Sequence, residues 1–172
     1  SSVGILRTLS MGMAMLAAQV GLAETPTTDT EKVATIEEMY AGYRSDFEGV
    51  PEIDAAELKL LVDAGEVVLV DVRAPAEREV SIIPGAISEE AFDPSQAAGK
   101  TIVAYCTIGY RSGEWVEKQR AAGVEARNFK GSVLAWSHAG GRFVTPAGEP
   151  TQRVHVYGKL WDLLRHDYQS VY

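Results

Sequence analysis

The sequence is poor in the residues that build metal sites and disulfides. It has one cysteine, Cys106, in 172 residues, which excludes an intramolecular disulfide and a cysteine cluster for zinc or iron–sulfur groups. Its three histidines, His138, His155 and His166, show no spacing typical of metal ligands. We therefore expect no metal and no cofactor, and a redox relay through the single thiol would need a partner.

Positive charge is also scarce. The 16 Lys and Arg residues are outnumbered by 24 Asp and Glu residues, which gives a net charge of -8. This balance argues against nucleic acid or an anionic membrane surface as the main partner. With 46% hydrophobic and 23% charged residues, the composition is that of an ordinary globular protein with one domain and extensions. An anionic small molecule would have to be attracted by a local site, because the whole surface is acidic.

Long apolar runs are absent except near the N-terminus. Residues 8–23 carry no charge and follow Arg7, but the run is shorter than the roughly 20 residues of a membrane span. Gly21 and Ala23 are small residues at the -3 and -1 positions of a cleavage site. We therefore interpret residues 1–23 as a signal peptide and expect an exported, periplasmic protein without a stable membrane span. An apolar helix or an uncleaved anchor is the alternative.

Composition divides the rest of the chain into three parts. Residues 24–50 are predicted to form a Thr- and Pro-rich linker followed by a helix over residues 31–47, where the apolar residues have a weak helical periodicity. Residues 51–144 carry the strong strand and helix signals of a domain. Residues 145–172 begin as a linker and are predicted to end in a helix, which packs on the domain or forms a dimer contact. The apolar face of this C-terminal helix consists of Leu160, Trp161 and Leu164.

Strand and helix signals alternate within residues 51–144. Asp54 and Glu57 form a capping box for a helix that ends at Gly65, and residues 67–72 form a nearly continuous apolar run. Such a run is typical of an interior strand of a parallel sheet. We expect further strands at residues 102–105 and 124–129, and helices at residues 75–79, 112–122 and 131–139. The alternation predicts an α/β fold with a central parallel sheet flanked by helices.

The cysteine falls at the predicted carboxyl end of a strand, where α/β proteins place their active sites. A short loop follows Cys106, and the next helix is expected to begin at Ser112. Loop amides, the N-terminal end of that helix and the charge of Arg111 would all favour the thiolate, which is the nucleophilic form of cysteine. A buried structural thiol is the alternative for a lone cysteine.

Three motifs in this region resemble the rhodanese family. They are LVDVR at residues 69–73 with Pro75, Glu77 and IPGA at residues 83–86; CTIGYRS at residues 106–112; and GSVLAW at residues 131–136. The second is similar to the active-site loop of single-domain rhodaneses. The resemblance runs from about residue 53 to residue 140, and it implies a rhodanese-like fold and a sulfurtransferase activity.

The resemblance also implies a role for each residue of the loop. Cys106 would be the nucleophile that takes sulfur from a small anionic donor such as thiosulfate, and would pass it from a persulfide to an external thiol or cyanide. Arg111 would steer the donor, and Asp71 and Arg73 would support the site, with Arg73 pairing with Glu77. The substrate-binding residues would be Thr107, Ile108, Gly109, Tyr110, Arg111 and Ser112.

The sequence departs from the family pattern at two places. Ser81 and Ile82 stand where the family commonly has Gly-His, so no histidine is expected to support this part of the site. Thr107 and Ile108 match neither the basic pair of thiosulfate-preferring loops nor the small polar pair of mercaptopyruvate-preferring loops, which leaves the donor open.

Two other functions remain open from the sequence. Phosphatases and arsenate reductases of this fold use a loop that is one residue longer, with Arg where Ser112 stands here. A binding or sulfide-sensing module would keep the fold without the activity.

Overall fold

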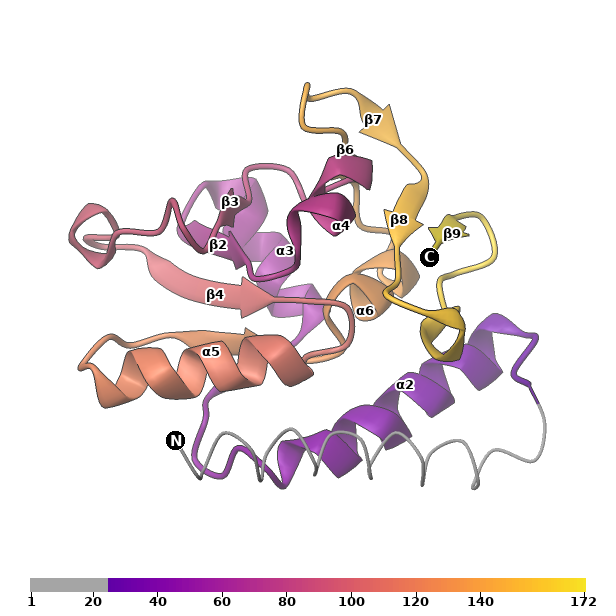
Figure 1. Cartoon of the computed structure of the whole chain (residues 1–172), viewed down its shortest axis with the longest axis horizontal. Coiled ribbons are helices and arrows are strands. Elements are labelled where there is room, and N and C mark those ends of the chain that lie inside the picture. The colour runs from indigo at the N-terminus through magenta and orange to yellow at the C-terminus, as the bar shows by residue number, and fades with distance from the viewer. Residues whose placement is uncertain (1–24) are drawn as a thin grey trace.

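The computed structural model describes residues 25–172 (Figure 1). The expected signal peptide, residues 1–23, lies outside the described residues and stays a prediction. Five parallel strands form the central sheet, which confirms the expected α/β architecture. In spatial order the strands are β1 (Glu52–Ile53), β5 (Arg127–Phe129), β4 (Thr101–Tyr105), β2 (Val67–Asp71) and β3 (Ile87–Ser88).

Five helices and a short 3-10 turn accompany the sheet. They are α2 (Asp29–Arg44), α3 (Ala55–Ala64), α4 (Pro75–Val80), η1 (Pro94–Gln96), α5 (Tyr110–Ala121) and α6 (Ser132–His138). Asp54 caps α3 by accepting a hydrogen bond of 2.8 Å from the amide of Glu57, and Gly65 ends the helix with a φ of 67°. Pro75 begins α4, as its preference for the first helical position predicts.

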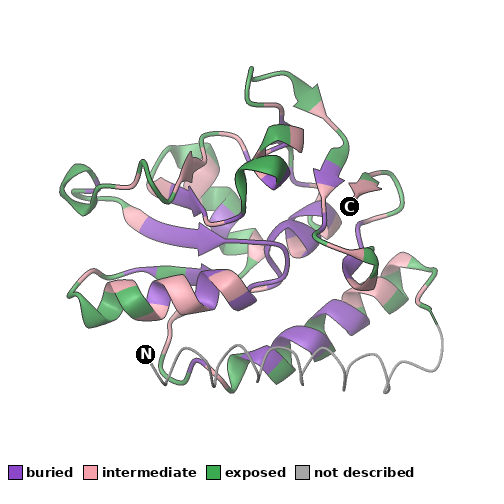
Figure 2. Cartoon of the chain, in the orientation of Figure 1, coloured by how far each residue is buried: buried purple, intermediate pink, exposed green. Residues whose placement is uncertain are grey.

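Side chains of β4 supply both faces of the sheet with apolar contacts. Val103 and Tyr105 belong to the cluster that includes α3 and α6, whereas Ile102 and Ala104 belong to the cluster that includes Val116 of α5. Because successive residues of a strand point to opposite faces, a strand covered on both sides needs apolar residues at every position. Figure 2 shows the resulting buried layer through the central strands and along one side of α2.

Two predicted boundaries differ from the structure. Helix α5 begins at Tyr110 rather than Ser112, because Gly109, with a φ of 121°, turns the chain directly into the helix. Strand β5 covers only the second half of the expected strand at residues 124–129. Gly123 has a φ of 85° and the amide of Val124 bonds to the carbonyl of Gln119, so these residues complete the end of α5 instead.

The predicted C-terminal helix is wrong. The expected linker is the turn of a hairpin between β6 (Phe143–Val144) and β7 (Pro150–Thr151), and β8 (Arg153–His155) then pairs with β9 (Gln169–Val171). Between β8 and β9 the chain forms only a 3-10 turn, η2 (Lys159–Trp161). The buried residues here are Trp161, Leu163 and Leu164. Trp161 and Leu164 would share one face of a helix, but Leu163 would not, and the observed turn buries all three.

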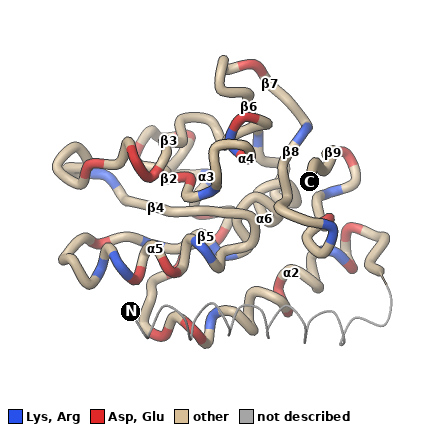
Figure 3. The backbone as a smooth tube through the Cα atoms, in the orientation of Figure 1, with Lys and Arg blue, Asp and Glu red and all other residues tan. Residues whose placement is uncertain are grey.

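Charged side chains are spread along the elements, with both signs on α2 and α5 (Figure 3). Within residues 25–172, the helices are all too short or too polar to cross a membrane. The Asp71–Arg73 pair differs from the other charges because both side chains are at most 1% exposed.

This buried pair connects four parts of the chain. Arg73 Nη2 lies 2.7 Å from Asp71 Oδ2 and also donates to the carbonyl of Ser81 at 2.8 Å, while Nη1 donates to the carbonyl of His155 at 3.4 Å. The hydroxyl of Tyr105 donates to Asp71 Oδ2 at 2.7 Å and accepts from the amide of Ile83. Burial lowers the pKa of Arg73, but the adjacent Asp71 carboxylate raises it by more, so the pKa lies above its ordinary value.

We expect Asp71→Asn to lower the free energy of unfolding by about 3–5 kcal/mol, because it leaves the Arg73 charge buried without a counter-ion. Urea unfolding followed by circular dichroism measures this loss. The matched control is Asp167→Asn, which breaks the exposed Arg165–Asp167 pair and should leave the urea midpoint nearly unchanged. Similar midpoints for the two variants would contradict a structural role for the buried pair.

Candidate active site

The structure places Cys106 directly after β4, at the carboxyl edge of the sheet, with 1% of the residue exposed. Hydrogen bonds to the start of α6 fix the loop that follows. The amide of Gly131 donates to the carbonyl of Ile108 at 2.9 Å, and those of Val133 and Leu134 donate to the carbonyls of Cys106 and Thr107 at 3.3 Å. Because these carbonyls are held by α6, the peptide groups of the loop cannot turn their carbonyl oxygens toward the sulfur.

Two polar groups contact the sulfur itself. The amide of Gly109 donates to Cys106 Sγ at 3.2 Å, and Ser112 Oγ lies 3.4 Å from Sγ. Ser112 Oγ also donates to Asn128 Oδ1 at 2.6 Å, and the amide of Cys106 donates to Ser132 Oγ at 3.1 Å. Asn128 and Ser132 were not predicted as site residues, although Ser132 lies within the third sequence motif.

The thiol is held below its ordinary pKa. Burial raises the pKa of Cys106, but the charge of Arg111 and the hydrogen bonds from Ser112 and Gly109 lower it by more. Each of these groups interacts more favourably with the thiolate than with the thiol, which is the form needed for nucleophilic attack. The arrangement can therefore present an activated sulfur nucleophile.

Arg111 is fixed beside the loop by a buried carboxylate. Its Nη1 and Nη2 donate to the two carboxylate oxygens of Glu77 at 2.8 and 2.9 Å, and Nη2 also donates to Thr107 Oγ1 at 3.1 Å. The ring of Tyr157 covers the guanidinium at 4.9 Å. Burial raises the pKa of Glu77, but Arg111 lowers it by more, so the carboxylate stays charged and holds Arg111 in a bidentate contact.

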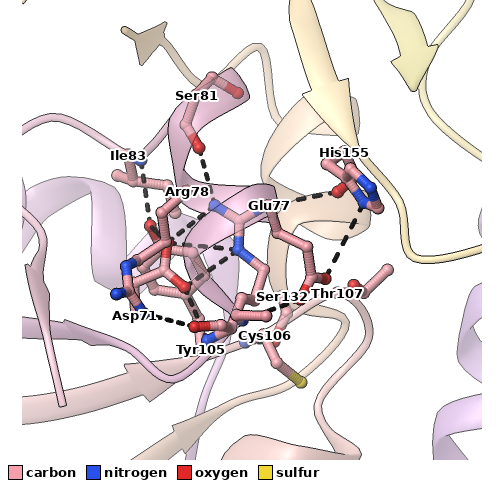
Figure 4. Close-up of polar contacts among 12 residues, drawn as sticks. Asp71, Glu77, Arg78, Ser81, Ile83, Tyr105, Cys106, Thr107, Ser132 and His155 are labelled. Atoms are coloured by element: carbon pink, nitrogen blue, oxygen red, sulfur yellow. Dashed lines mark hydrogen bonds and ion pairs between the residues drawn. The ribbon is translucent and has the colours of Figure 1, made fainter. Parts of the chain in front are cut away.

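The predicted pairing of Arg73 with Glu77 is therefore wrong. Arg73 pairs with Asp71, because its backbone amide and guanidinium both turn back onto that carboxylate, and Glu77 instead reaches across to Arg111. Asp71 and Arg73 do not line the space around the sulfur. Asp71 instead accepts a hydrogen bond from the hydroxyl of Tyr105, as Figure 4 shows, and Arg73 donates to the carbonyl of Ser81 at the end of α4.

A histidine also reaches this region, contrary to the expectation drawn from Ser81 and Ile82. His155 of β8 has Nδ1 4.0 Å from Glu77 Oε1 (Figure 4). The amide of Tyr157 donates to the same nitrogen at 3.0 Å. The sequence pattern missed this residue because it comes from the C-terminal segment.

A small cavity of about 20 Å³ lies against the sulfur. It is lined by Tyr43, Cys106, Thr107, Ile108, Tyr110, Arg111, Tyr157 and Trp161. The structure thus brings the predicted loop residues together, with Gly109 and Ser112 contacting the sulfur directly. Three aromatic residues of the lining, Tyr43, Tyr157 and Trp161, were missed because they belong to segments that flank the predicted domain. A larger groove of about 420 Å³ between α2, α3 and α6 contains none of the residues that contact the sulfur.

Among the described residues, no group of three or more His, Cys, Asp or Glu side chains is arranged to hold a metal ion. At this site the sulfur is contacted by the amide of Gly109 and lies close to the charge of Arg111.

Comparison with known proteins identifies the domain. The Rhodanese-like domain family model matches residues 54–139. An uncharacterized protein of Synechocystis sp. is 42% identical over 89 residues, which cover 48% of this chain and 50% of that protein. A sulfurtransferase of Allochromatium vinosum is 32% identical over 106 residues, which cover 58% of this chain and 99% of that protein.

Solved structures share the fold. A thiosulfate sulfurtransferase from Pseudomonas aeruginosa aligns with a TM-score of 0.52 and 23% identity, over 66% of this chain and 23% of the other. At this identity the likeness shows the fold alone. The chain spans about half the length of the Synechocystis relative, so that protein's remaining part has no counterpart in the match.

We expect Arg111→Gln to raise the pKa of Cys106, because it removes the positive charge and leaves the Glu77 carboxylate nearby. Ultraviolet absorbance of the thiolate as a function of pH measures the change. In the unmodified protein the thiolate should persist below the midpoint of a free cysteine, about 8.5, and be lost only as the pH falls through the lower pKa of the folded state. The matched control is Arg120→Gln, at the exposed end of the same helix, which should leave the midpoint unchanged. Equal titration curves for the two variants would contradict the role of Arg111.

Proposed function

Because the chain belongs to the rhodanese-like family, we propose that it is a sulfurtransferase that carries sulfane sulfur as a persulfide on Cys106. The observation that supports this most directly is the contact between the Gly109 amide and Cys106 Sγ, beside the charge of Arg111. A buried thiolate with a hydrogen-bond donor and a cation nearby is suited to nucleophilic attack at sulfur.

In the first step the Cys106 thiolate attacks the outer sulfur of an anionic donor such as thiosulfate. A bond forms between Sγ and that sulfur, the S–S bond of the donor breaks, and sulfite leaves with the electron pair. The persulfide anion keeps the negative charge of the original thiolate. The same groups that lower the pKa of Cys106 therefore favour the product as well.

In the second step an external nucleophile removes the sulfur. Cyanide or a thiolate attacks the outer sulfur of the persulfide, the S–S bond breaks, and the electron pair returns to Cys106 as thiolate. The products are thiocyanate or a new persulfide on the acceptor. Since Cys106 is the only cysteine, no second thiol in the same chain can resolve the persulfide.

Arg111 serves this reaction mainly through position and charge. Both of its terminal nitrogens are bonded to Glu77, so its attraction for an anion is weaker than that of an unpaired arginine. Thr107 and Ile108 add no further charge to the loop. The site is therefore suited to several sulfane sulfur donors, and its composition does not single out thiosulfate.

The loop does not support phosphoryl or arsenate chemistry. Ser112 occupies the position of the arginine used in the longer loops, and its hydroxyl lies 3.4 Å from Sγ. A sulfide-sensing or binding module is the second candidate, because Cys106 is 1% exposed and a slow or regulated reaction would fit such a closed site.

Intact-mass measurement of the protein before and after incubation with thiosulfate, mercaptopyruvate or polysulfide tests the proposal. We expect a gain of one sulfur atom with at least one donor, and no gain in Cys106→Ser, which removes the nucleophile while changing one atom. Circular dichroism verifies that the variant is folded. If the unmodified protein gains no sulfur from any of the three donors, the binding-module function is the better description.

A further inference from the structure

Two buried polar atoms beside Cys106, Tyr43 Oη and Trp161 Nε1, have no hydrogen-bond partner of normal geometry among the described residues, although the indole N–H approaches the phenol oxygen closely enough to lower its pKa. Within residues 25–172, three buried side-chain polar atoms are unpartnered, and two of them, Tyr43 Oη and Trp161 Nε1, belong to residues that line the cavity at the sulfur. Tyr43 is 2% exposed and Trp161 is 7% exposed. Burying a hydroxyl or an indole N–H without a partner is unfavourable, so each such group calls for an explanation.

Aromatic packing, and not hydrogen bonding, holds these two side chains in place. The ring of Tyr43 packs edge-on against Tyr110 of the loop at 5.4 Å, and Trp161 packs edge-on against Tyr157 at 5.2 Å. Tyr157 in turn covers the guanidinium of Arg111. The orientation of both rings is therefore set by the catalytic loop and by Arg111, while their polar atoms remain available.

Tyr43 and Cys106 line the same cavity, and their charges interact. Burial raises the pKa of Tyr43, the indole N–H of Trp161 lowers it somewhat, and the negative charge of Cys106 raises it again. The hydroxyl therefore keeps its proton and is within electrostatic reach of Sγ. Both groups are neutral donors, and such donors in aromatic surroundings suit a weakly hydrated, polarisable anion.

The cavity limits the size of that anion. Its volume of about 20 Å³ is near the room that one water molecule needs, which leaves space for roughly one further heavy atom on Sγ. A persulfide adds one sulfur atom to the thiol. The space in the cavity therefore matches the single outer sulfur of a persulfide.

We propose that Tyr43 and Trp161 donate hydrogen bonds to the outer sulfur of the Cys106 persulfide, so that both flanking segments complete the site. This inference rests on the proposed sulfurtransferase function. Tyr43 lies on α2 and Trp161 lies on η2, and both fall outside residues 54–139 that match the family. Since neither donor has a partner of normal hydrogen-bond geometry in the thiol form, their hydrogen bonds stabilise the persulfide selectively.

Tyr43→Phe and Trp161→Phe test the proposal, because each removes one donor and keeps an aromatic ring. The protein is loaded with inorganic polysulfide, freed of excess reagent, and titrated with sulfite at a fixed thiosulfate concentration. Sulfite removes the outer sulfur as thiosulfate and returns Cys106 to the thiolate, and intact mass gives the persulfide fraction. We expect each variant to release half of its sulfur at roughly one tenth of the sulfite concentration that the unmodified protein requires.

Tyr168→Phe is the matched control. It removes a tyrosine hydroxyl that donates to the carbonyl of Gly141 at 2.7 Å and whose residue does not line the cavity. This variant should lose stability without a change in the sulfite titration. Tyr43→Phe should behave in the opposite way, because removing an unpartnered hydroxyl does not weaken the thiol form.

The possible results separate the two proposals. If the unmodified protein takes up sulfur on Cys106 and the titrations of Tyr43→Phe and Trp161→Phe coincide with its own, the two donors are not persulfide ligands and the sulfurtransferase function stands. If the unmodified protein takes up no sulfur on Cys106, the sulfurtransferase function fails, and the persulfide site fails with it.

Discussion

The buried Asp71–Arg73 ion pair is the contact on which the geometry of the site depends. A charge pair at most 1% exposed is tolerated only if its remaining polar atoms are satisfied, and here Tyr105, Ser81 and His155 satisfy them. These partners belong to β4, the end of α4 and β8. The requirement to satisfy one buried guanidinium thus brings a core strand, a short helix and the C-terminal segment to the same edge of the sheet.

The position of Arg111 follows from that arrangement. Helix α4 begins just after Arg73, and Glu77 at its first turn accepts from the amide of Ala74 at 2.9 Å while it binds Arg111. The carboxylate therefore fixes Arg111 and at the same time weakens its charge. What remains, together with the backbone amides of Gly109 and Ser112, still outweighs the burial of Cys106 and favours the thiolate. The sulfur of Cys106 can be buried and still ionise, because its hydrogen-bond donors are already in place when the thiolate charge develops.

The features of this structure that could be predicted from the sequence depend on residues close to one another along the chain. The cap at Asp54, the end at Gly65, the apolar run of β2 and the loop after Cys106 all depend on residues a few positions apart. The contacts that were missed join distant segments. Glu77 and Arg111 are 34 positions apart, and Arg73 and the carbonyl of His155 are 82 apart. The prediction of a C-terminal helix was wrong for the same reason. The helical spacing of Leu160, Trp161 and Leu164 is a local signal, and the burial of Trp161 beside the loop outweighs it.

The flanking segments contribute residues to the site just as the family domain does. The domain supplies the nucleophile, the loop amides and Arg111, which are sufficient to make a thiolate. It does not supply Tyr43, Tyr157 or Trp161, which form much of the wall around the sulfur. A relative that shares only residues 54–139 shares the reactive group without this wall. Since the wall limits what can sit on the sulfur, we expect substrate preference to depend on α2 and the C-terminal segment as much as on the loop after Cys106.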